Sequence, residues 1–543
     1  MKSIKKILAV ILSMTLMLTL GTAAFGAQKT LPSGKDTGSI NVTNLKPGDT
    51  VTAYQFVKAD YNEYGFTGYS AINNYVKDPV APTAQEVIDM ASNAATMTVA
   101  AEKKVATGDT EVTLNGLPVG YYLVMVTSGS ETVYSPMIAG IYYSKSATDN
   151  TLTNGAISVD SDFEIKAQKC WAKSSTPKLE KTIVTPSSKN SKGDDIAIGD
   201  KITFNLSATV PSYSKEYKKV TYKIYDIMSE GLDYVDGSMK CFIEKYENNR
   251  ENIKVAPKVN GGIIEITFDS KFILEHPGQK IQVEYQAKLN EKAGVNFDAN
   301  INKAYLEYSN NTASGSTAKT GEDKVYVYTF GIDSNLFGKS TEKWNEKTKE
   351  LIKVEEGEYQ WVETEKESGI FTTTTALEGA TFTLTNNKTK KSYTATSDKY
   401  GYLKFTGLDA GEYTLQETDA PDGFTLNDAK HTVVITAEYN QDGTLKSYTI
   451  KIDDKATSTY TATYDKGVIK TITSTKDSQG NISESAILKN SKMSFLPSTG
   501  GVGTTIFAIV GVVFVAVALG LHMILRGKSK QSSYFCTAYI KIP

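Results

Sequence analysis

Three polar side chains that can react with one another interrupt apolar rows of predicted β-strands: Lys181, Asp226 and Asn302. Alternate residues of a strand share a face, and the rows read Leu179-Lys181-Ile183, Tyr222-Ile224-Asp226 and Asn302-Ala304-Leu306-Tyr308. Burying one such group alone costs several kcal/mol, so three inward-facing ones favour a common purpose. Burial would lower the pKa of the lysine and raise that of the aspartate, leaving a neutral, nucleophilic amine. The alternatives are that each faces solvent or is a hydrogen-bonded buried group.

Both ends of the chain carry apolar segments. Lys2, Lys5 and Lys6 precede an apolar run and a small-residue region ending near Gly26, which predicts a signal peptide at residues 1–26. At the other end, residues 504–525 are about the ~20 helical residues needed to cross a bilayer. Basic residues in the tail, residues 526–543, belong on the cytoplasmic side. We therefore expect an exported chain with a C-terminal transmembrane helix.

The composition of the chain argues against several classes of function. The chain has 543 residues, 59 basic and 61 acidic, so nothing indicates a nucleic-acid partner. The three histidines are scattered, which gives a histidine-based catalytic or metal site little support. We expect no metal and no cofactor. Of the three cysteines, Cys170 and Cys241 lie before the span and could pair, but their spacing is not that of a metal or redox motif.

The elements that must position these residues are mostly strands. Short alternating runs, rich in Tyr and Thr, are separated by Gly, Asn and Asp turns, the pattern of antiparallel β-sandwiches. The best helix candidate runs from Ala84 to Asn93, with Thr83 and Glu86 as a capping box. The turn at residues 116–122 recurs at residues 407–413 as Gly-Leu-x-x-Gly-x-Tyr, so the first and last regions are predicted to share a domain type.

Two sets of residues carry a resemblance. The peptide Leu496-Pro497-Ser498-Thr499-Gly500, followed by the span and basic residues, resembles the cell-wall sorting signal of Gram-positive surface proteins, which a sortase cleaves between Thr499 and Gly500. The stretch at residues 379–382, the repeated turn and residues 413–424 resemble Cna-B-type immunoglobulin-like domains. The middle region resembles the related domain of SpaA-type major pilins. Residues 531–543 depart from this pattern, because family members usually stop at the basic residues.

The resemblance implies an all-β chain of three tandem immunoglobulin-like sandwiches. We expect an N-terminal Cna-B-like sandwich at residues 30–173, a middle pilin domain at 174–327, a C-terminal Cna-B domain at 328–492 and the sorting motif at 496–500. Such domains form an intramolecular Lys–Asn amide bond assisted by a buried acid. In the middle domain this implies that Lys181 attacks the Asn302 carboxamide, while protonated Asp226 hydrogen-bonds the amide oxygen and ammonia leaves.

In the C-terminal domain the resemblance assigns the acid to Glu417 and the amide to Asn490. Lys339 is the preferred lysine. Lys343 is kept as the alternative, because Lys339 is out of step with the inward row of the preceding strand unless a bulge intervenes. A polar insertion at residues 341–375 also departs from the family pattern. In the first domain Val126 stands where Glu417 stands in the last. We therefore expect no such bond in residues 30–170.

Major pilins also carry a lysine that accepts the sorting threonine of the next copy. The matching place here reads Cys170-Trp171-Ala172-Lys173-Ser174. Lys173 is the preferred acceptor and Lys169 the alternative, and an ordinary solvated linker lysine also fits. The implied function is a structural shaft subunit of a covalent pilus on the cell surface, a sortase substrate and not an enzyme. A wall-anchored monomeric adhesin or accessory pilin is the alternative.

The resemblance also implies the partners. These are other copies of the chain, a class C pilus sortase, a housekeeping sortase, tip and base pilins, peptidoglycan and a host ligand.

Overall fold

The structure is a computed structural model. It describes residues 31–489 except 129–130, 145–156, 158–162, 246–248, 312–314, 333–337, 341–348, 356–357, 364–372, 376, 400–402, 454–455 and 477–486. The predicted signal peptide, Lys343, Asn490, the sorting motif, the transmembrane helix and the tail therefore lie outside the described residues.

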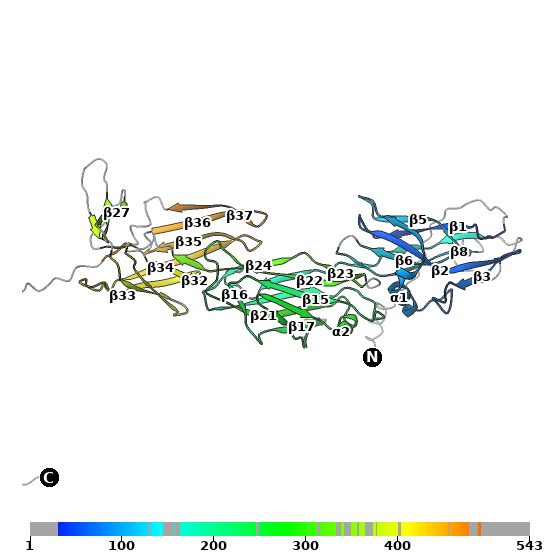
Figure 1. Cartoon of the computed structure of the whole chain (residues 1–543), viewed down its shortest axis with the longest axis horizontal. Coiled ribbons are helices and arrows are strands. Elements are labelled where there is room, and N and C mark those ends of the chain that lie inside the picture. The colour runs from blue at the N-terminus through cyan, green and yellow to red at the C-terminus, as the bar shows by residue number, and fades with distance from the viewer. Residues whose placement is uncertain are drawn as a thin grey trace, which may run out of the picture.

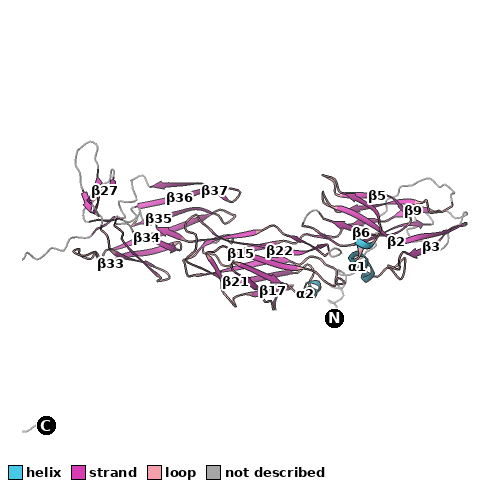
Figure 2. Ribbon diagram, viewed as in Figure 1, coloured by secondary structure: helices cyan, strands magenta, loops and turns pink. Residues whose placement is uncertain are grey.

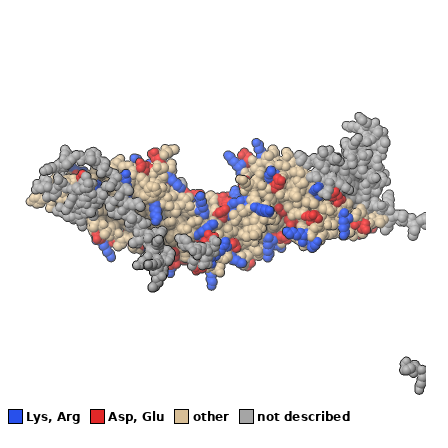
Figure 3. All heavy atoms as spheres, turned by 180° about the vertical axis from the view of Figure 1, so that it is seen from behind, with Lys and Arg blue, Asp and Glu red and all other residues tan. Residues whose placement is uncertain are grey.

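The described residues form β-rich units that follow one another along an elongated molecule (Figure 1). Nearly all regular structure is strand (Figure 2), so the all-β sandwich prediction is confirmed. The described helices are α1 (Ala84–Ser92), η2 (Ala94–Thr96) and α2 (Ser270–Glu275). Lys and Arg are interspersed with Asp and Glu over the face seen in Figure 3.

The N-terminal unit packs two sheets, in the orders β10-β1-β5 and β3-β2-β6-β8-β9, with β4 paired to β2. Its core includes Ile40, Val42, Val124 and Cys170, and buried positions alternate with more exposed ones along β1 and β10, whereas β6 is buried over nearly its whole length. The strands are β1 (Thr37–Thr43), β2 (Thr50–Asn62), β3 (Gly65–Ala71), β4 (Val99–Lys104), β5 (Glu111–Pro118), β6 (Gly120–Thr127), β7 (Val133–Tyr134), β8 (Met137–Ser144), β9 (Glu164–Ala167), β10 (Lys169–Trp171) and β11 (Ser174–Ser175).

Helix α1 forms where its capping signals predict it. The Thr83 side chain accepts from the Glu86 backbone N–H, and the Glu86 carboxylate accepts from the Thr83 N–H at 2.8 Å. These bonds satisfy donors that a helix start leaves unpaired. The buried face of α1, which includes Val87 and Met90, then packs on the sheet that contains β6.

The middle unit also packs two sheets, in the orders β12-β14-β21-β17-β18, with β16 paired to β21, and β13-β24-β22-β15-β20-β19, with β23 paired to β22. The strands are β12 (Leu179–Ile183), β13 (Gly193–Asp195), β14 (Lys201–Thr209), β15 (Tyr222–Met228), β16 (Leu232–Tyr234), β17 (Lys240–Lys245), β18 (Asn249–Ile253), β19 (Lys258–Asn260), β20 (Ile263–Thr267), β21 (Lys280–Leu289), β22 (Asn300–Asn311), β23 (Ser316–Lys319) and β24 (Asp323–Tyr328).

The C-terminal unit is built on a seven-stranded sheet, β31-β30-β33-β34-β35-β36-β37. Part of the polar insertion forms a small sheet of its own, β27-β28-β29. The strands are β25 (Phe330–Ile332), β26 (Gly338–Ser340), β27 (Lys349–Glu355), β28 (Glu358–Glu363), β29 (Thr373–Thr375), β30 (Thr381–Asn386), β31 (Ser392–Thr396), β32 (Phe405–Leu408), β33 (Gly411–Asp419), β34 (Lys430–Tyr439), β35 (Leu445–Ile452), β36 (Ala456–Asp465), β37 (Val468–Lys476) and β38 (Ile487–Lys489).

The repeated turn has the same geometry in the first and last units. Gly116 and Gly407 have φ of 70° and 78°, a left-handed conformation that favours glycine. Six residues after each glycine, a buried tyrosine hydroxyl donates to a backbone carbonyl four residues before it: Tyr122 to Pro118 at 2.5 Å, and Tyr413 to Asp409 at 2.8 Å. The sequence repeat is therefore a structural repeat.

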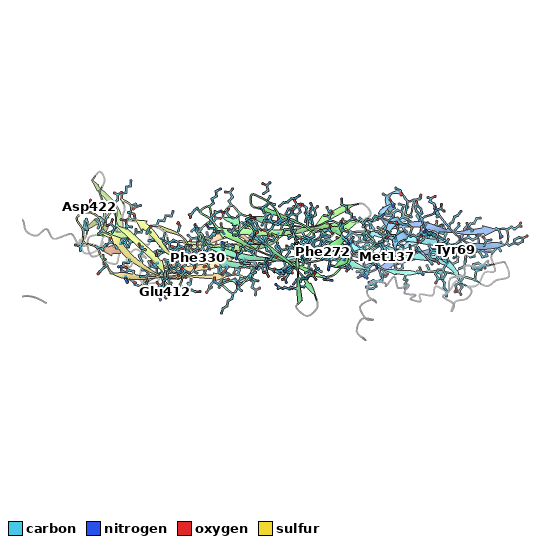
Figure 4. All side chains as sticks on the ribbon, turned by 90° about the horizontal axis from the view of Figure 1, so that it is seen from below. Tyr69, Met137, Phe272, Phe330, Glu412 and Asp422 are labelled. Atoms are coloured by element: carbon cyan, nitrogen blue, oxygen red, sulfur yellow. The ribbon has the colours of Figure 1, made fainter. Side chains whose placement is uncertain are left out.

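Asp195 anchors the middle unit to the C-terminal unit. It lies at the end of β13, and its carboxylate accepts from the Tyr439 hydroxyl at 2.6 Å and from the Ala410 N–H at 2.5 Å. The backbone N–H of Ile198 adds a bond to the Gly407 carbonyl at 3.0 Å. Phe330, labelled in Figure 4, lies near this junction, in the strand that follows β24. Burial raises the pKa of Asp195 to about 6, although its two donors act in the opposite direction.

Because the pKa of Asp195 is raised, we predict that the contribution of this residue to the free energy of unfolding falls as pH rises through about 6. The folded state holds the Asp195 proton more tightly than the unfolded chain, so the contribution is present at low pH and lost at higher pH. Relative to Asp195→Asn, the parent should lose about 1 kcal/mol of unfolding free energy between pH 5 and pH 7.5. Denaturant titrations of both proteins at each pH measure this difference, and equal pH profiles would contradict it.

Candidate functional site

The middle unit buries the three polar residues of its apolar rows completely. Lys181, Asp226 and Asn302 are each 0 % exposed. Lys181 comes from β12 in one sheet, while Asp226 and Asn302 come from the neighbouring strands β15 and β22 of the other. The residues predicted to share their faces are buried with them. The site therefore spans the core from one sheet to the other.

Tyr285, on β21, connects the three side chains. Lys181 Nζ donates to Asp226 Oδ2 and, at 3.1 Å, to the Tyr285 hydroxyl. That hydroxyl donates to Asp226 Oδ1 at 2.7 Å and accepts from Asn302 Nδ2 at 2.7 Å. Sequence reasoning missed Tyr285. Its inward position on β21 is a signal, but the chain has 32 tyrosines, and a tyrosine in an apolar row is ordinarily a core residue.

The surroundings of the site are aromatic and dry. Lys181 Nζ lies 5.0 Å from the centroid of the Phe204 ring and 5.3 Å from that of Tyr285. Burial lowers the pKa of Lys181 and raises the pKa of Asp226, although each charge opposes the shift of the other. Asn302 Oδ1 is buried and has no hydrogen-bond partner among the described residues. A buried carbonyl without a hydrogen bond is costly, so Asn302 Oδ1 can accept a hydrogen bond from a nearby donor.

The backbone of Lys181 is held separately from its side chain. Its N–H donates to Asp323 Oδ2 at 2.7 Å, and its carbonyl accepts from Lys192 Nζ at 2.6 Å. Lys192 and Asp323 are themselves paired at 2.6 Å. These contacts fix the strand that carries the buried amine.

In the C-terminal unit, Glu417 is 2 % exposed and lies on the inward row of β33 with Tyr413 and Leu415. Its carboxylate accepts from the Asn427 N–H at 2.7 Å. Strand β26 lies parallel to β38, with Lys339 beside Leu488. The backbone thus places Lys339 close in register to the strand that leads to Asn490. In the N-terminal unit, Val126 is part of the apolar core.

Lys169 and Lys173 are exposed near the start of the middle unit, and the buried residues Cys170 and Ala172 alternate with them. The Lys173 carbonyl accepts from the Ser135 N–H at 3.0 Å, and the next residues pair with β7 as β11. Lys173 therefore projects from a fixed backbone.

Within the described ranges, no cluster of three His, Cys, Asp or Glu side chains is arranged to hold a metal ion. No helix in that part of the chain is both long enough and apolar enough to span a membrane.

Comparisons with known proteins match three parts of the chain. Residues 35–174 match the T6 antigen Ig-like domain, residues 371–449 match the SpaA prealbumin-like fold domain, and residues 489–531 match the LPXTG cell wall anchor motif. The chain is 26% identical to the trypsin-resistant surface T6 protein of Streptococcus pyogenes serotype M6, over 92% of this chain and 96% of that protein.

One solved structure supports the fold, and a second one is a weaker match. The T6 backbone pilin of serotype M6 Streptococcus pyogenes has a TM-score of 0.58 at 20% identity, covering 85% of this chain and all of that one. The full-length major pilin SpaD of Corynebacterium diphtheriae has a TM-score of 0.44 at 16% identity, covering 74% of this chain and 91% of that one. The chain is thus a cell-wall-anchored surface protein with an LPxTG sorting signal, and it is similar to Gram-positive major pilins.

The two cysteines that could have paired do not. Cys170 lies in the core of the N-terminal unit and Cys241 in that of the middle unit, and both are free. Burial raises the pKa of each thiol to about 12.

Both thiols should therefore resist alkylation in the folded protein, because the thiolate is the reactive form. Iodoacetamide at pH 8 should leave Cys170 and Cys241 unmodified in the native exported chain and modify both after denaturation. Peptide mass spectrometry measures the modified fraction at each site. Rapid labelling of either native thiol would contradict this assignment.

Proposed function

We propose that this protein is the shaft subunit of a sortase-assembled covalent pilus, joined through Lys173. The observation that carries the proposal is the combination of a donor and an acceptor in one chain. The donor is the LPXTG anchor region, and the acceptor is an exposed lysine on a fixed backbone near the start of the middle unit. Only a chain with both can extend a polymer of itself.

The joining reaction is a transpeptidation. The sortase cysteine breaks the Thr499–Gly500 bond and holds the Thr499 carbonyl as a thioester, while Gly500 leaves as an amine. The Lys173 amine of another copy then attacks that carbonyl. A new amide forms, and the proton that the amine loses returns to the sulfur and regenerates the sortase thiol.

We also propose that the middle unit makes a Lys181–Asn302 amide bond. The buried contacts support this, because the pKa of Lys181 is lowered and that of Asp226 is raised, which favours a neutral amine beside a protonated acid. The Lys181 nitrogen attacks Asn302 Cγ, the Cγ–Nδ2 bond breaks, and Asp226 transfers a proton from the amine to the departing ammonia. Protonated Asp226 can donate to Asn302 Oδ1, which has no described partner.

In this scheme Tyr285 positions the reacting groups. Its hydroxyl bonds to all three side chains and keeps the amide beside the acid. The sequence-based scheme placed Asp226 directly on the amide, whereas in the structure Asn302 Nδ2 donates to the Tyr285 hydroxyl. Bond formation would require Asn302 to exchange this contact for one with Lys181.

For the C-terminal unit we propose the corresponding bond between Lys339 and Asn490, assisted by Glu417. The buried carboxylate and the pairing of β26 with β38 support it. We retain the domain limits 30–173, 174–327 and 328–492. We assign polymerisation to a class C pilus sortase and wall attachment to a housekeeping sortase, with tip and base pilins as further partners.

Wall extracts of cells that make this protein should show a ladder that survives boiling in detergent. Lys173→Ala should collapse the ladder to monomer, because it removes the attacking amine. Lys169→Ala is the matched control, since Lys169 is also an exposed lysine and lies four residues before Lys173. A ladder that survives Lys173→Ala refutes this acceptor assignment, and a parent without any ladder favours the wall-anchored monomeric adhesin or accessory pilin.

Each amide bond should lower the intact mass of the exported chain by about 17 Da, the mass of one ammonia. Asp226→Ala should restore one ammonia mass and leave the Glu417-dependent bond intact. Losing the middle bond reopens a loop of more than 100 residues, which should cost roughly 4 to 5 kcal/mol of stability by analogy with disulfide loops. Intact-mass spectrometry and denaturant titration measure the two effects.

Tyr285→Phe tests the positioning role. It should slow bond formation in the middle unit, giving a mixture of bonded and unbonded masses soon after synthesis. Tyr222→Phe is the matched control, because the Tyr222 hydroxyl is buried in the same core without a hydrogen-bond partner among the described residues. Equal bonding rates in the two variants would remove Tyr285 from the mechanism, and full calculated mass in the parent would refute the bond itself.

A further inference from the structure

The loop between β12 and β13 contacts both the buried site of the middle unit and the surface of the C-terminal unit. Residues 184–192, hereafter the junction loop, join the strand that carries Lys181 to the strand that ends at Asp195. The buried Asp194 carboxylate fixes the loop, because it accepts from the backbone N–H groups of Ser187 and Ser188, each at 3.0 Å. A loop held in this way moves as one piece, so a displacement at one of its contacts displaces the others.

Lys192, the last residue of the junction loop, holds the backbone of the buried lysine. Its Nζ donates to the Lys181 carbonyl and to Asp323 Oδ2, each at 2.6 Å. The same carboxylate oxygen accepts from the Lys181 N–H at 2.7 Å. Strand β12 is the outermost strand of its sheet, and these two side chains bind the backbone groups that a further strand would otherwise pair.

The other side of the junction loop lies against the turn between β34 and β35. Asn190 Nδ2 donates to the Asn440 carbonyl at 2.7 Å, while Asn190 Oδ1 accepts from the Lys192 N–H at 2.9 Å. The two backbones are also in direct contact. A Cβ on Gly193 would lie 2.2 Å from the Gly443 carbonyl oxygen, and one on Gly443 would lie 2.2 Å from the Lys192 carbonyl oxygen. Only glycine fits on either side of this contact.

We propose that docking of the C-terminal unit on the junction loop positions Lys181 for amide bond formation, with Lys192 and Asp323 as positioning residues. This inference rests on the proposed Lys181–Asn302 bond and leaves its chemistry unchanged. Three hydrogen bonds in series, of 2.7, 2.9 and 2.6 Å, connect the C-terminal unit to the backbone of the reacting lysine. The loop thus joins a contact between units to a site inside one of them.

The position of this backbone matters because bond formation is sensitive to small displacements. An attacking amine must lie roughly 3 to 3.5 Å from the carbon that it attacks, and a misplacement of about 1 Å can cost ~100-fold in rate. The Lys181 side chain starts from the backbone that Lys192 and Asp323 hold. Loosening of the junction loop therefore moves the amine relative to Asn302, which belongs to the opposite sheet.

This arrangement makes the middle bond depend on a completed neighbour. Synthesis and folding proceed from the N-terminus, so the middle unit is made before the unit that carries Asn440 and Gly443. Until that unit docks, the junction loop lacks its outer support and Lys181 is less well placed. Bond formation in the middle unit is therefore fastest in chains whose C-terminal unit has folded.

Gly443→Ala tests the coupling without altering the middle unit. The added Cβ meets the Lys192 backbone, so the Lys181–Asn302 bond should form on the order of ten-fold more slowly in the exported chain. Gly379→Ala is the matched control, because Gly379 lies in the same unit with φ of 88° against 89° for Gly443, but a Cβ there meets nothing within 4 Å. Mass spectrometry of the cross-linked peptide at successive times after synthesis measures the rate.

Asn190→Ala is a milder change that removes only the side-chain link between the units. It should slow bonding in the same direction, and it keeps the test valid if Gly443→Ala does not fold. Parental bonding rates in these two variants, or equal slowing in Gly379→Ala, overturn the coupling. A parent that yields no cross-linked peptide from the middle unit instead refutes the proposed bond, so the two failures are distinguishable.

Lys192→Met tests the positioning residue itself. It should also slow bonding on the order of ten-fold, whereas Lys192→Arg keeps a charged donor and should restore most of the rate. Lys223→Met is the matched control, because it breaks another ion pair of the middle unit, with side chains 31% and 25% exposed against 22% and 29% for Lys192 and Asp323. Denaturant titration in an Asp226→Ala background, which lacks the middle bond, compares the stabilities of the two methionine variants. Equal slowing in both, or slowing that follows their loss of stability, overturns the positioning role.

Discussion

The buried hydrogen bond between Lys181 and Asp226 constrains the arrangement of the middle unit. Both groups are completely buried, and removing either one would take a hydrogen-bond partner from the other inside an apolar core, which is costly. The two residues come from opposite sheets, so the pair fixes how the sheets lie against each other. The Tyr285 hydroxyl accepts a hydrogen bond from Lys181, donates one to Asp226, and accepts one from the Asn302 amide. Such an arrangement is a costly way to gain stability alone, but it suits a site that forms a bond once.

Several parts of this site could be predicted from the sequence because they depend on local periodicity. Lys181, Asp226 and Asn302 interrupt rows of period two, and the structure buries those rows as strand geometry requires. The capping box of α1 and the repeated glycine turn depend equally on neighbours in sequence. Each signal lies within a few residues, so a single sequence suffices.

Other parts depend on contacts between distant segments and could not be read in this way. Tyr285 is 104 residues from Lys181, and its hydroxyl is distinguished from those of other buried tyrosines only by the neighbours that the two sheets bring to it. Asp195 is similar, because its partner Tyr439 is 244 residues away. The separate burial of Cys170 and Cys241 also follows from which core each strand joins. Residue type and local spacing therefore do not indicate which distant residues become partners.

The position of the buried site suggests how a polymer of such units carries load. In the proposed polymer, a pull on Lys173 enters the middle unit through β11 and β12, and Lys181 lies eight residues after this proposed acceptor. With the proposed amide bond formed, force passes at Lys181 from β12 to Asn302 on β22, which pairs with β24, the strand that leads into the C-terminal unit. The pull would then not break the hydrogen bonds between β12 and β14 one after another. A covalent connection at this depth therefore protects the sandwich that lies between one joining point and the next, whereas the same bond far from β12 would leave the first strand free to peel away.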